Sequence, residues 1–407
     1  MTMKSLYKIF TTLLVITWFT ALTQAQVSPN NATVKGNNQF AIELYKQLTK
    51  GQNTNFFASP YSISSALAMT YAGAQNTTAT EMAKVLRFTP DNLHQDYKML
   101  SDHFKSINRK GLELKIANAL WGEKSYPFLP DYLSLNQKYY QAKIESLNFK
   151  QYPERSRLII NKWVENKTKN KIKNLIPKGL VDKKTRLVLT NAIYFKGDWE
   201  YEFLKRNTKK MAFIAGKQRF PAIKFMYMQR KFRYTENKQL QAIEIPYKGR
   251  KMSLLILLPK DKNGLARLEQ KLNAKEYQDL IERMYRTKVQ LTLPRFKMTI
   301  NTRLSSTLKQ LGMKQAFSNQ ANFSKMAKNA QLKISEIVHK AFVEVNEQGT
   351  EAAAATAVII APSGSAPGRT YPPKIFKADH PFMFIIKDNK TNSILFIGKL
   401  ENPKQAS

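Results

Sequence analysis

The sequence contains no cysteine, and its 407 residues include only four histidines, His94, His103, His339 and His380. The lack of cysteine excludes disulfides, thiolate nucleophiles and cysteine-ligated metal sites. His94 and His103 are nine positions apart, whereas a zinc-protease helix places its two histidines about four apart on one face. The chain also lacks a nucleophile elbow, a phosphate loop and a dinucleotide-binding glycine pattern. We therefore expect no catalytic residue, no metal site and no enzymatic activity.

Acidic residues are scarce: 29 Asp and Glu stand against 66 Lys and Arg, and the formal net charge is +37. Such an imbalance favours polyanions and steers them to the surface. The densest basic tracts are 162–184 and 205–233. The candidate polyanion-binding residues in them are Lys167, Lys169, Lys171, Lys173, Lys209, Lys210, Arg230 and Lys231. The alternative is that the charge only aids solubility, because a basic run is usually a solvated face.

Long apolar runs are also absent, except near the start of the chain. Lys4 and Lys8 precede the apolar run 9–22, and the small-residue site 23–25 follows it. This pattern predicts a secretory signal peptide at 1–25, too short to span a membrane. No later stretch reaches the roughly 18 apolar residues that a spanning helix needs. We expect a secreted, extracellular protein without a membrane span.

Secretion narrows the choice of polyanion and makes glycosylation relevant. A sulfated glycosaminoglycan or an acidic matrix is the expected partner. Nucleic acid is disfavoured, because neither an aromatic platform nor a helix-turn-helix pattern stands out. The glycosylation sequons lie at Asn31, Asn76, Asn166, Asn322 and Asn389. Asn31 and Asn76 are near predicted surface turns, and we expect only some of the five to carry glycans.

The domain organisation follows from a lack of linkers and repeats. No Gly/Ser-rich or acidic linker divides the chain, and the one breaker-rich segment, 362–373, lies too near the end to precede a second domain. We expect a tail at 26–36 and a single domain at 37–403. A chain of this size can bury a large core, and without disulfides its stability must come from packing.

Hydrophobic periodicity predicts a mixture of helices and strands. Phe40, Leu44, Tyr45 and Leu48 share one helical face. Further helices are predicted at 62–73, 92–107, 154–175 and 264–286, and strands at 187–195, 252–258, 289–293, 382–386 and 394–397. Helices dominate the first half and strands the second, which favours an α+β fold over regular alternation.

The stretch 344–363 combines features of a strand and of a loop. Its four consecutive alanines are compatible with a helix, but Val343 and Val345 alternate with polar residues and 358–360 is β-branched. In a strand, alternate side chains share a face, and the small residues Thr350, Ala352, Ala354 and Thr356 would then lie together, with Glu351 towards solvent. A face of small residues could enter a sheet above a packed core without overpacking it. Gly349 supplies the backbone freedom to turn there. We predict a segment with two states, an exposed loop and an inserted strand.

The segment from Glu347 through Gly349 to Thr356 resembles the hinge of the inhibitory serpins. The segments 55–63, 190–199, 334–340, 379–382 and 396–399 also resemble serpin segments in the family's order. The nearest resemblance is to insect or other arthropod serpins. It implies an α+β serpin fold of about nine helices around three β-sheets, with an exposed reactive-centre loop at about 347–373, in a protein that is a monomer.

The resemblance also implies a mechanism. A protease attacks the loop and forms an acyl-enzyme, and the loop then inserts into the central sheet and carries the trapped protease in a covalent 1:1 complex. Release of stored strain drives the insertion. No cofactor is required. A sulfated glycosaminoglycan is a candidate accelerator, for which the family often uses the helix expected here at 92–107, with Lys98, Lys105 and Arg109.

Individual residues receive roles from the same resemblance. Ser59, Ser62, Asn191 and His339 match the hydrogen-bonded shutter under the central sheet. Trp199 matches the aromatic residue at the breach, where insertion begins, and Arg295 falls where the family places a basic partner for Glu347. On local grounds alone, His339 is a buried hydrogen-bonding histidine and Trp199 a core aromatic residue. Gln348 departs from the family, which more often has a charged residue there.

The scissile bond has two candidate positions in the loop. The family spacing, counted from Glu347, places it at Ser363–Gly364 after Pro362, which favours an elastase-like serine protease. Arg369–Thr370 would suit a trypsin-like protease but lies six residues further along. The alternatives are a cross-class inhibitor of papain-like cysteine proteases and a noninhibitory serpin that acts as a polyanion-binding, matrix or carrier protein.

Overall fold

The computed structural model describes residue 28 and residues 30–328, 332–350 and 372–404. The α-helices within these ranges are α1 (Ala32–Thr49), α2 (Pro60–Tyr71), α3 (Asn76–Leu86), α4 (Leu93–Ser106), α5 (Pro130–Tyr140), α6 (Pro153–Lys167), α7 (Leu265–Lys271), α8 (Ala274–Glu282) and α9 (Ser305–Gln310). The strands are β1 (Phe56–Ala58), β2 (Leu112–Glu123), β3 (Lys143–Leu147), β4 (Leu187–Asp198), β5 (Lys209–Ala215), β6 (Gln218–Glu236), β7 (Leu240–Pro246), β8 (Met252–Pro259), β9 (Tyr285–Pro294), β10 (Phe296–Arg303), β11 (Glu336–Val345), β12 (Gly349–Thr350), β13 (Lys374–Lys377), β14 (Phe382–Asp388) and β15 (Ile394–Leu400). In the part of the chain described, no helix is both long and apolar enough to cross a bilayer.

The strands form two hydrogen-bonded sheets. One has the order β10-β11-β12-β4-β2-β3, and the other has the order β1-β15-β14-β8-β7-β6-β9-β13, with β5 paired to β6. The α+β class and the nine helices are confirmed in the described residues. Three sheets are expected and two are present in the part of the chain that the structure describes. The long strand β6 pairs with β5, β9 and β7, and so joins strands of two expected sheets into one.

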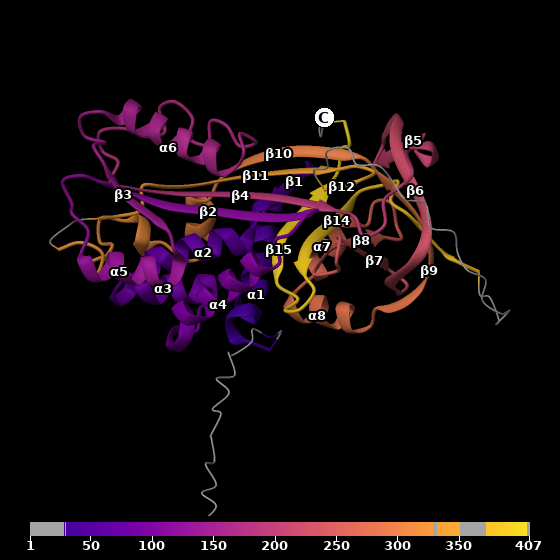
Figure 1. Ribbon diagram of the computed structural model, residues 1–407, viewed down its shortest axis with the longest axis horizontal. Coiled ribbons are helices and arrows are strands. Elements are labelled where there is room, and N and C mark those ends of the chain that lie inside the picture. The colour runs from indigo at the N-terminus through magenta and orange to yellow at the C-terminus, as the bar shows by residue number, and fades with distance from the viewer. Residues whose placement is uncertain (1–27, 29, 329–331, 351–371, 405–407) are drawn as a thin grey trace, which may run out of the picture.

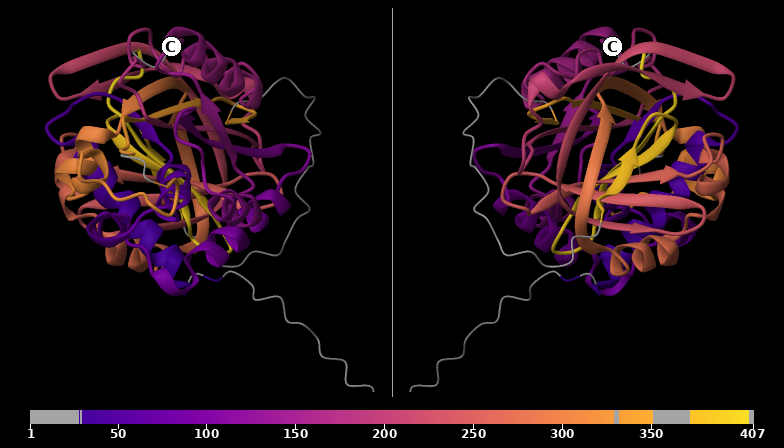
Figure 2. Two further views of the ribbon diagram at one scale, coloured as in Figure 1. Left: turned by 90° about the vertical axis from the view of Figure 1, so that its left-hand side faces the viewer. Right: turned by 90° about the vertical axis from the view of Figure 1, so that its right-hand side faces the viewer.

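The six-stranded sheet lies between two helical layers. Figure 1 shows α6 on one side of it and α2 to α5 on the other, and the end-on views in Figure 2 show the same order of layers. The inner face packs Leu189, Ile193 and Phe195 of β4 into the main core, and the outer face packs Val188 and Ala192 against α6. Burial of both faces makes β4 almost continuously apolar, which is why its sequence predicts a strand clearly.

The predicted boundaries differ most from the structure in three places. Helix α6 ends at Lys167 instead of 175, because Lys169 and Asn170 take positive φ values of 52° and 59°. The predicted helix 264–286 is two helices and the start of β9, since the side chain of Asn273 caps the new helix α8. The predicted tail 26–36 is too long: α1 begins at Ala32, with Asn31 as its cap and Val34 buried.

Candidate functional site

Strands β4 and β11 are paired along only part of their length. They run parallel and pair from Glu336–Val188 to Ala341–Ile193, a stretch we call the seam. Beyond the seam, β12 lies between them and is antiparallel to both, with Thr350 opposite Val345 on one side and Gly197 on the other. The first residues of the predicted hinge therefore already separate the two strands at one end of the sheet.

Gly349 is required in β12 because of close packing. A Cβ atom at this position would lie 2.1 Å from the carbonyl oxygen of Gly197 and 2.7 Å from Cα of Asp198. We predicted a need for backbone freedom, but Gly349 does not lie in the left-handed region where a side chain is strained. The turn before it is held by Asn346, whose Oδ1 accepts from the amides of Gln348 at 3.0 Å and Gly349 at 3.3 Å.

Thr350 faces the interior, as the alternation of the hinge predicts. It is 1% exposed, and its hydroxyl hydrogen-bonds the Tyr247 hydroxyl at 2.7 Å. Burial raises the pKa of Tyr247, so its hydroxyl stays protonated. The other predicted hinge residues, Ala352, Ala354 and Thr356, lie outside the described residues, as do the candidate reactive residues Ser363, Gly364, Arg369 and Thr370.

Glu347 is buried and held from several sides. Its Oε1 accepts from the Thr208 hydroxyl at 2.8 Å, and its backbone oxygen accepts from the amide of Phe203 at 2.9 Å. Arg295 is present as expected, with Nε 3.7 Å from Oε2 of Glu347. The family-derived pair therefore exists as a long ion pair. The sequence carried no signal for Thr208, the nearer partner.

Trp199 packs directly against the hinge turn. Its indole nitrogen donates to the backbone oxygen of Asn346 at 2.9 Å, and its backbone amide donates to the oxygen of Gln348 at 2.8 Å. Its ring stacks on Tyr247, with centroids 4.8 Å apart and planes 8° from parallel. Trp199 and Tyr247 thus support the entry of β12 into the sheet.

The four predicted shutter residues meet in one buried network. His339 Nε2 accepts from the amide of Ser59 at 3.0 Å, and its Nδ1 lies 2.5 Å from Oδ1 of Asn191. The amide nitrogen of Asn191 donates to the Ser62 hydroxyl and to Oδ1 of Asn118. The Ser59 hydroxyl donates to the backbone oxygen of Leu395 at 2.6 Å. Asn118 is the member that the sequence did not reveal.

This network sets the protonation of His339 and spans the seam. Nε2 accepts and Asn191 presents its oxygen to Nδ1, so the neutral ring carries its proton on Nδ1. Burial lowers the pKa of His339 to about 3. Asn191 and His339 are also opposite each other in the β4–β11 register. Their hydrogen bond therefore joins the two strands that an inserting loop would separate.

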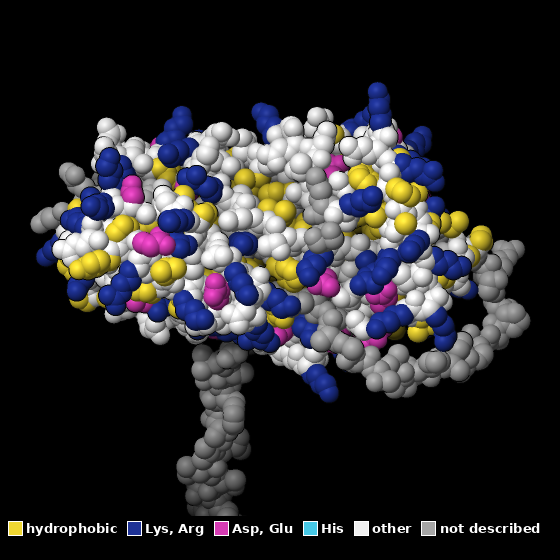
Figure 3. All heavy atoms as spheres, turned by 90° about the horizontal axis from the view of Figure 1, so that it is seen from above, with side chains coloured by type: hydrophobic (Ala, Val, Ile, Leu, Met, Phe, Trp, Pro, Cys, Tyr) yellow, Lys and Arg dark blue, Asp and Glu magenta, His cyan; other side chains and the backbone are white. Residues whose placement is uncertain are grey.

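The basic residues fall into two groups. Lys167, Lys169, Lys171 and Lys173 are exposed at the end of α6 and just after it, whereas Lys209, Lys210, Arg230 and Lys231 are exposed on β5 and β6 of the other sheet. Figure 3 shows the face on the α6 side, with many lysines and arginines and few carboxylates. In the candidate helix α4, Lys98 pairs with Asp102, and Lys105 bonds Gln141. The group after α6 is the one that lies near the seam.

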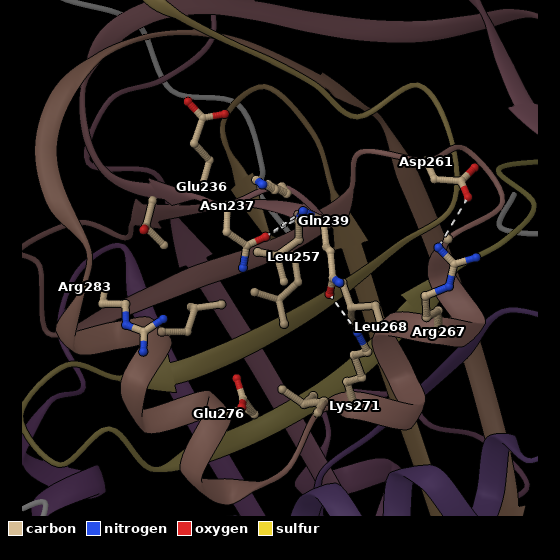
Figure 4. Close-up of a pocket in the computed structure, with 16 residues that line it drawn as sticks. Glu236, Asn237, Gln239, Leu257, Asp261, Arg267, Leu268, Lys271, Glu276 and Arg283 are labelled. Carbon is tan, nitrogen blue, oxygen red and sulfur yellow. Dashed lines mark hydrogen bonds and ion pairs between the residues drawn. The ribbon is translucent and has the colours of Figure 1, made fainter.

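Two further features bear on the expected sites. In the described part of the chain, no group of three His, Cys, Asp or Glu residues could hold a metal ion. A cavity of about 450 Å³ lies between α7, α8 and the turn before β7, and Figure 4 shows Leu257 and Leu268 within it, with Arg283 and Arg267 on opposite sides. This cavity contains none of the predicted site residues, so it is separate from the hinge and the shutter.

The sequons differ in accessibility. Asn76 and Asn166 are exposed, whereas Asn31 and Asn322 are half-buried. Asn389 is half-buried, and its Nδ2 donates to the backbone oxygen of Arg250 at 3.0 Å and to the Ser253 hydroxyl at 2.7 Å, which disfavours it as an acceptor. A glycan would replace one of the two hydrogens on that nitrogen, so at least one of these bonds would be lost.

Comparison with known proteins identifies the family. Residues 35–403 match the family model described as Serpin (serine protease inhibitor). Human Serpin B3 is 42% identical over 92% of this chain and 100% of its own length, and the horse leukocyte elastase inhibitor is 40% identical over 90% and 98%. Serpin48 of the insect Tenebrio molitor has a TM-score of 0.82 and 30% identity, covering 92% of this chain and 98% of its own. Uncleaved ovalbumin has a TM-score of 0.81 and 32% identity, covering 91% and 100%. The expectation of no enzymatic activity agrees with a family of protease inhibitors, and the chain belongs to the serpin family.

Proposed function

We propose that this serpin is a secreted suicide inhibitor that traps a serine protease as a covalent acyl-enzyme and inserts its cleaved loop between β4 and β11. The observation that carries the proposal is the position of β12, which occupies the first two places of the required strand. Thr350 faces inwards there and bonds Tyr247. Further insertion in the same register would extend this pairing along both strands.

Continuing the β12 register shows what insertion would require. Ala354 would come between Ile193 and Ala341, and Thr356 between Asn191 and His339. The pairs of the seam and the Asn191–His339 hydrogen bond would break, and an antiparallel strand would then pair on both sides. Small side chains at these positions limit overpacking of the core below.

We infer an elastase-like target cleaved at Ser363–Gly364. The small residues at this bond support the inference, and the relatives include leukocyte elastase inhibitors of horse and cattle. Cleavage at Arg369–Thr370 by a trypsin-like protease, and trapping of a papain-like cysteine protease, are the alternatives that an experiment must separate.

The setting of this activity is also proposed. The apolar start of the chain at 1–25 supports secretion, the net charge of +37 supports an extracellular sulfated polyanion as a partner, and the exposed Asn76 and Asn166 suit glycans. We further propose an active monomer of arthropod origin; the similar structure from Tenebrio molitor is compatible with that origin.

The test is to mix the mature protein with pancreatic elastase, trypsin and papain, followed by denaturing gels and intact mass spectrometry. We expect a covalent complex with elastase and a released C-terminal peptide that begins at Gly364. A peptide that begins at Thr370 would move the reactive bond to Arg369. A complex with papain alone would change the target class.

A noninhibitory serpin is the second candidate. The uncommon Gln348 and the long proline- and glycine-containing loop favour it, and ovalbumin and thyroxine-binding globulin are among the similar structures. Cleavage with no complex for any protease, and no rise in thermal stability after cleavage, would support this candidate. A sharp rise after cleavage would show that the loop can insert.

A further inference from the structure

The segment after α6, residues 168–175, crosses from β4 to β11, and we call it the strap. Lys169 Nζ lies 5.6 Å from the centroid of the Tyr194 ring on β4, and Lys171 Nζ lies 5.6 Å from that of Phe342 on β11. The backbone oxygen of Lys173 accepts from Lys340 Nζ on β11 at 2.8 Å. The strap is therefore held by both of the strands that insertion would part.

The strap crosses β4 and β11 where the seam ends and the two strands stop pairing, and we call this point the fork. Tyr194 and Phe342 directly follow Ile193 and Ala341, the last residues that pair across the seam. Ile172 and Leu175 are buried against the outer face of the sheet and anchor the strap there. An inserting loop would meet the strap as it passes from the open end into the seam.

The backbone of the strap is unusual. Lys169, Asn170 and Asn174 have positive φ values of 52°, 59° and 49°. A residue other than glycine is uncommon in this region and is held there by its surroundings. Lys169 is itself one of these residues, so a ligand that engages the strap lysines would act on this backbone directly.

Lysines gather on both sides of the fork. On the β4 side, Lys169 and Lys115 both pair with Glu113, at 2.6 Å and 3.0 Å. On the β11 side, the ammonium groups of Lys171 and Lys297 lie 5.6 Å and 5.7 Å from the centroid of the Phe342 ring, and Lys297 pairs with Glu344 at 3.4 Å. Two carboxylates thus share this surface with a larger number of ammonium groups, which is the complement of a strongly anionic chain.

We propose that Lys169, Lys171 and Lys173, with Lys115 and Lys297, bind a sulfated oligosaccharide that spans the fork and retards loop insertion. The proposal rests on the proposed inhibitory function. Insertion adds one strand, about 4.8 Å of separation, between β4 and β11. A ligand that contacts both sides binds the closed sheet more tightly and therefore opposes opening by linkage. The polyanion is then a brake on the trapping step, in contrast to the accelerator expected from the family.

The experiment measures how the acyl-enzyme partitions between trapping and hydrolysis. The protease that forms a complex is titrated with and without a heparin octasaccharide, and cleaved inhibitor is quantified against covalent complex. We expect the cleaved fraction per complex to rise about fivefold or more. The double variant Lys169→Gln/Lys171→Gln should lose this response. The matched control Lys183→Gln/Lys184→Gln removes the same charge from exposed positions beyond the strap and should keep the response.

A second readout separates this proposal from the proposed function. Octasaccharide binding to the uncleaved protein is measured by calorimetry over a range of salt concentrations. The strap variant should lower the salt slope by about 1.5, and the control should leave it unchanged. If the wild-type protein traps no protease, the proposed function is wrong, but the calorimetric measurement still tests whether the strap binds the octasaccharide. Equal responses of strap variant and control, a higher yield of complex with octasaccharide, or the same effects from a single-stranded DNA of equal charge would overturn the inference.

Discussion

Strands β4 and β11 are separated at one end and paired at the other. At one end, Gly349 and Thr350 already lie between the strands, and the hinge rests on the stacked rings of Trp199 and Tyr247. At the other end, the strands touch and a buried hydrogen bond between Asn191 and His339 joins them. The beginning of insertion therefore needs no new opening of the sheet. Its continuation requires a buried polar network to be broken, and such networks are costly when only partly satisfied.

The largest expected effect is at the open end. Thr350→Arg would place a charge at a buried position next to Tyr247. An unpaired buried charge costs several kcal/mol, so we expect the yield of covalent complex on denaturing gels to fall by about tenfold or more, with cleaved protein in its place. Glu351→Arg, at the neighbouring position expected to face solvent, is the control. An undiminished yield for Thr350→Arg would count against insertion.

A substitution at the paired end of the two strands should lower the free energy of unfolding. Asn191→Ala would leave Nδ1 of His339 without its partner and would remove one hydrogen bond each from the Ser62 hydroxyl and from Oδ1 of Asn118. Each unsatisfied group costs about 1 to 3 kcal/mol, and we expect the free energy of unfolding in urea to drop by about 3 kcal/mol. Asn301→Ala, on the exposed edge strand β10, should change it by less than about 0.5 kcal/mol. Similar effects for the two variants would show that the network does not hold the seam.

Acid should weaken the closed end through His339. Its pKa in the folded state is about 3, below the ordinary value of about 6.5. The unfolded chain therefore binds the extra proton between these values, so stability is complete above pH 6.5 and falls as the pH drops towards 3. We expect His339 to account for a loss of about 1.5 kcal/mol between pH 6.5 and 5. His339→Asn should remove that part of the slope, and an unchanged slope would contradict the neutral buried ring. His94, whose pKa burial also lowers, acts in the same window and remains in both proteins.

The smallest effect is expected for the ion pair of the hinge. Arg295 lies 3.7 Å from Glu347 and is 39% exposed, and pairs of this kind contribute about 1 kcal/mol or less. Arg295→Ala should therefore change the melting temperature slightly and leave the yield of complex intact, because Thr208 still bonds Glu347. Lys288→Ala, which removes an equal charge from an exposed position on strand β9, is the comparison. A large loss of complex for Arg295→Ala alone would give this pair a role in trapping.

Local pattern was enough for some of these features. The alternation of the hinge predicts the inward face of Thr350, and the apolar run of β4 predicts a strand, which the structure shows to be buried on both faces. The shutter needed the family resemblance, because Ser59, Asn191 and His339 are far apart in the sequence and meet only through the sheet register. A local sequence pattern cannot predict contacts between residues so far apart in the chain.

Other features could not be predicted because they depend on packing. Asn118, Tyr247 and Thr208 act through contacts with distant segments, and none of them lies in a recognisable motif. Helix α6 ends at Lys167 because Lys169 and Asn170 adopt a left-handed backbone, which the lysine-rich sequence there does not predict. For Gly349, the residue type was interpreted as a need for freedom, whereas the structure shows a need for space.

The hydrogen bond across the seam also affects the lifetime of the uncleaved protein. If the inserted form is the more stable one, the uncleaved protein persists as long as the pairs of the seam and the contact between Asn191 and His339 delay spontaneous opening. Its working life is then a half-life set by an activation barrier, and unfolding-type barriers make such rates rise about three- to sixfold for every 10 °C. Higher storage temperature and lower pH would therefore shorten the life of a preparation by weakening the seam and its buried network, before any protease is added.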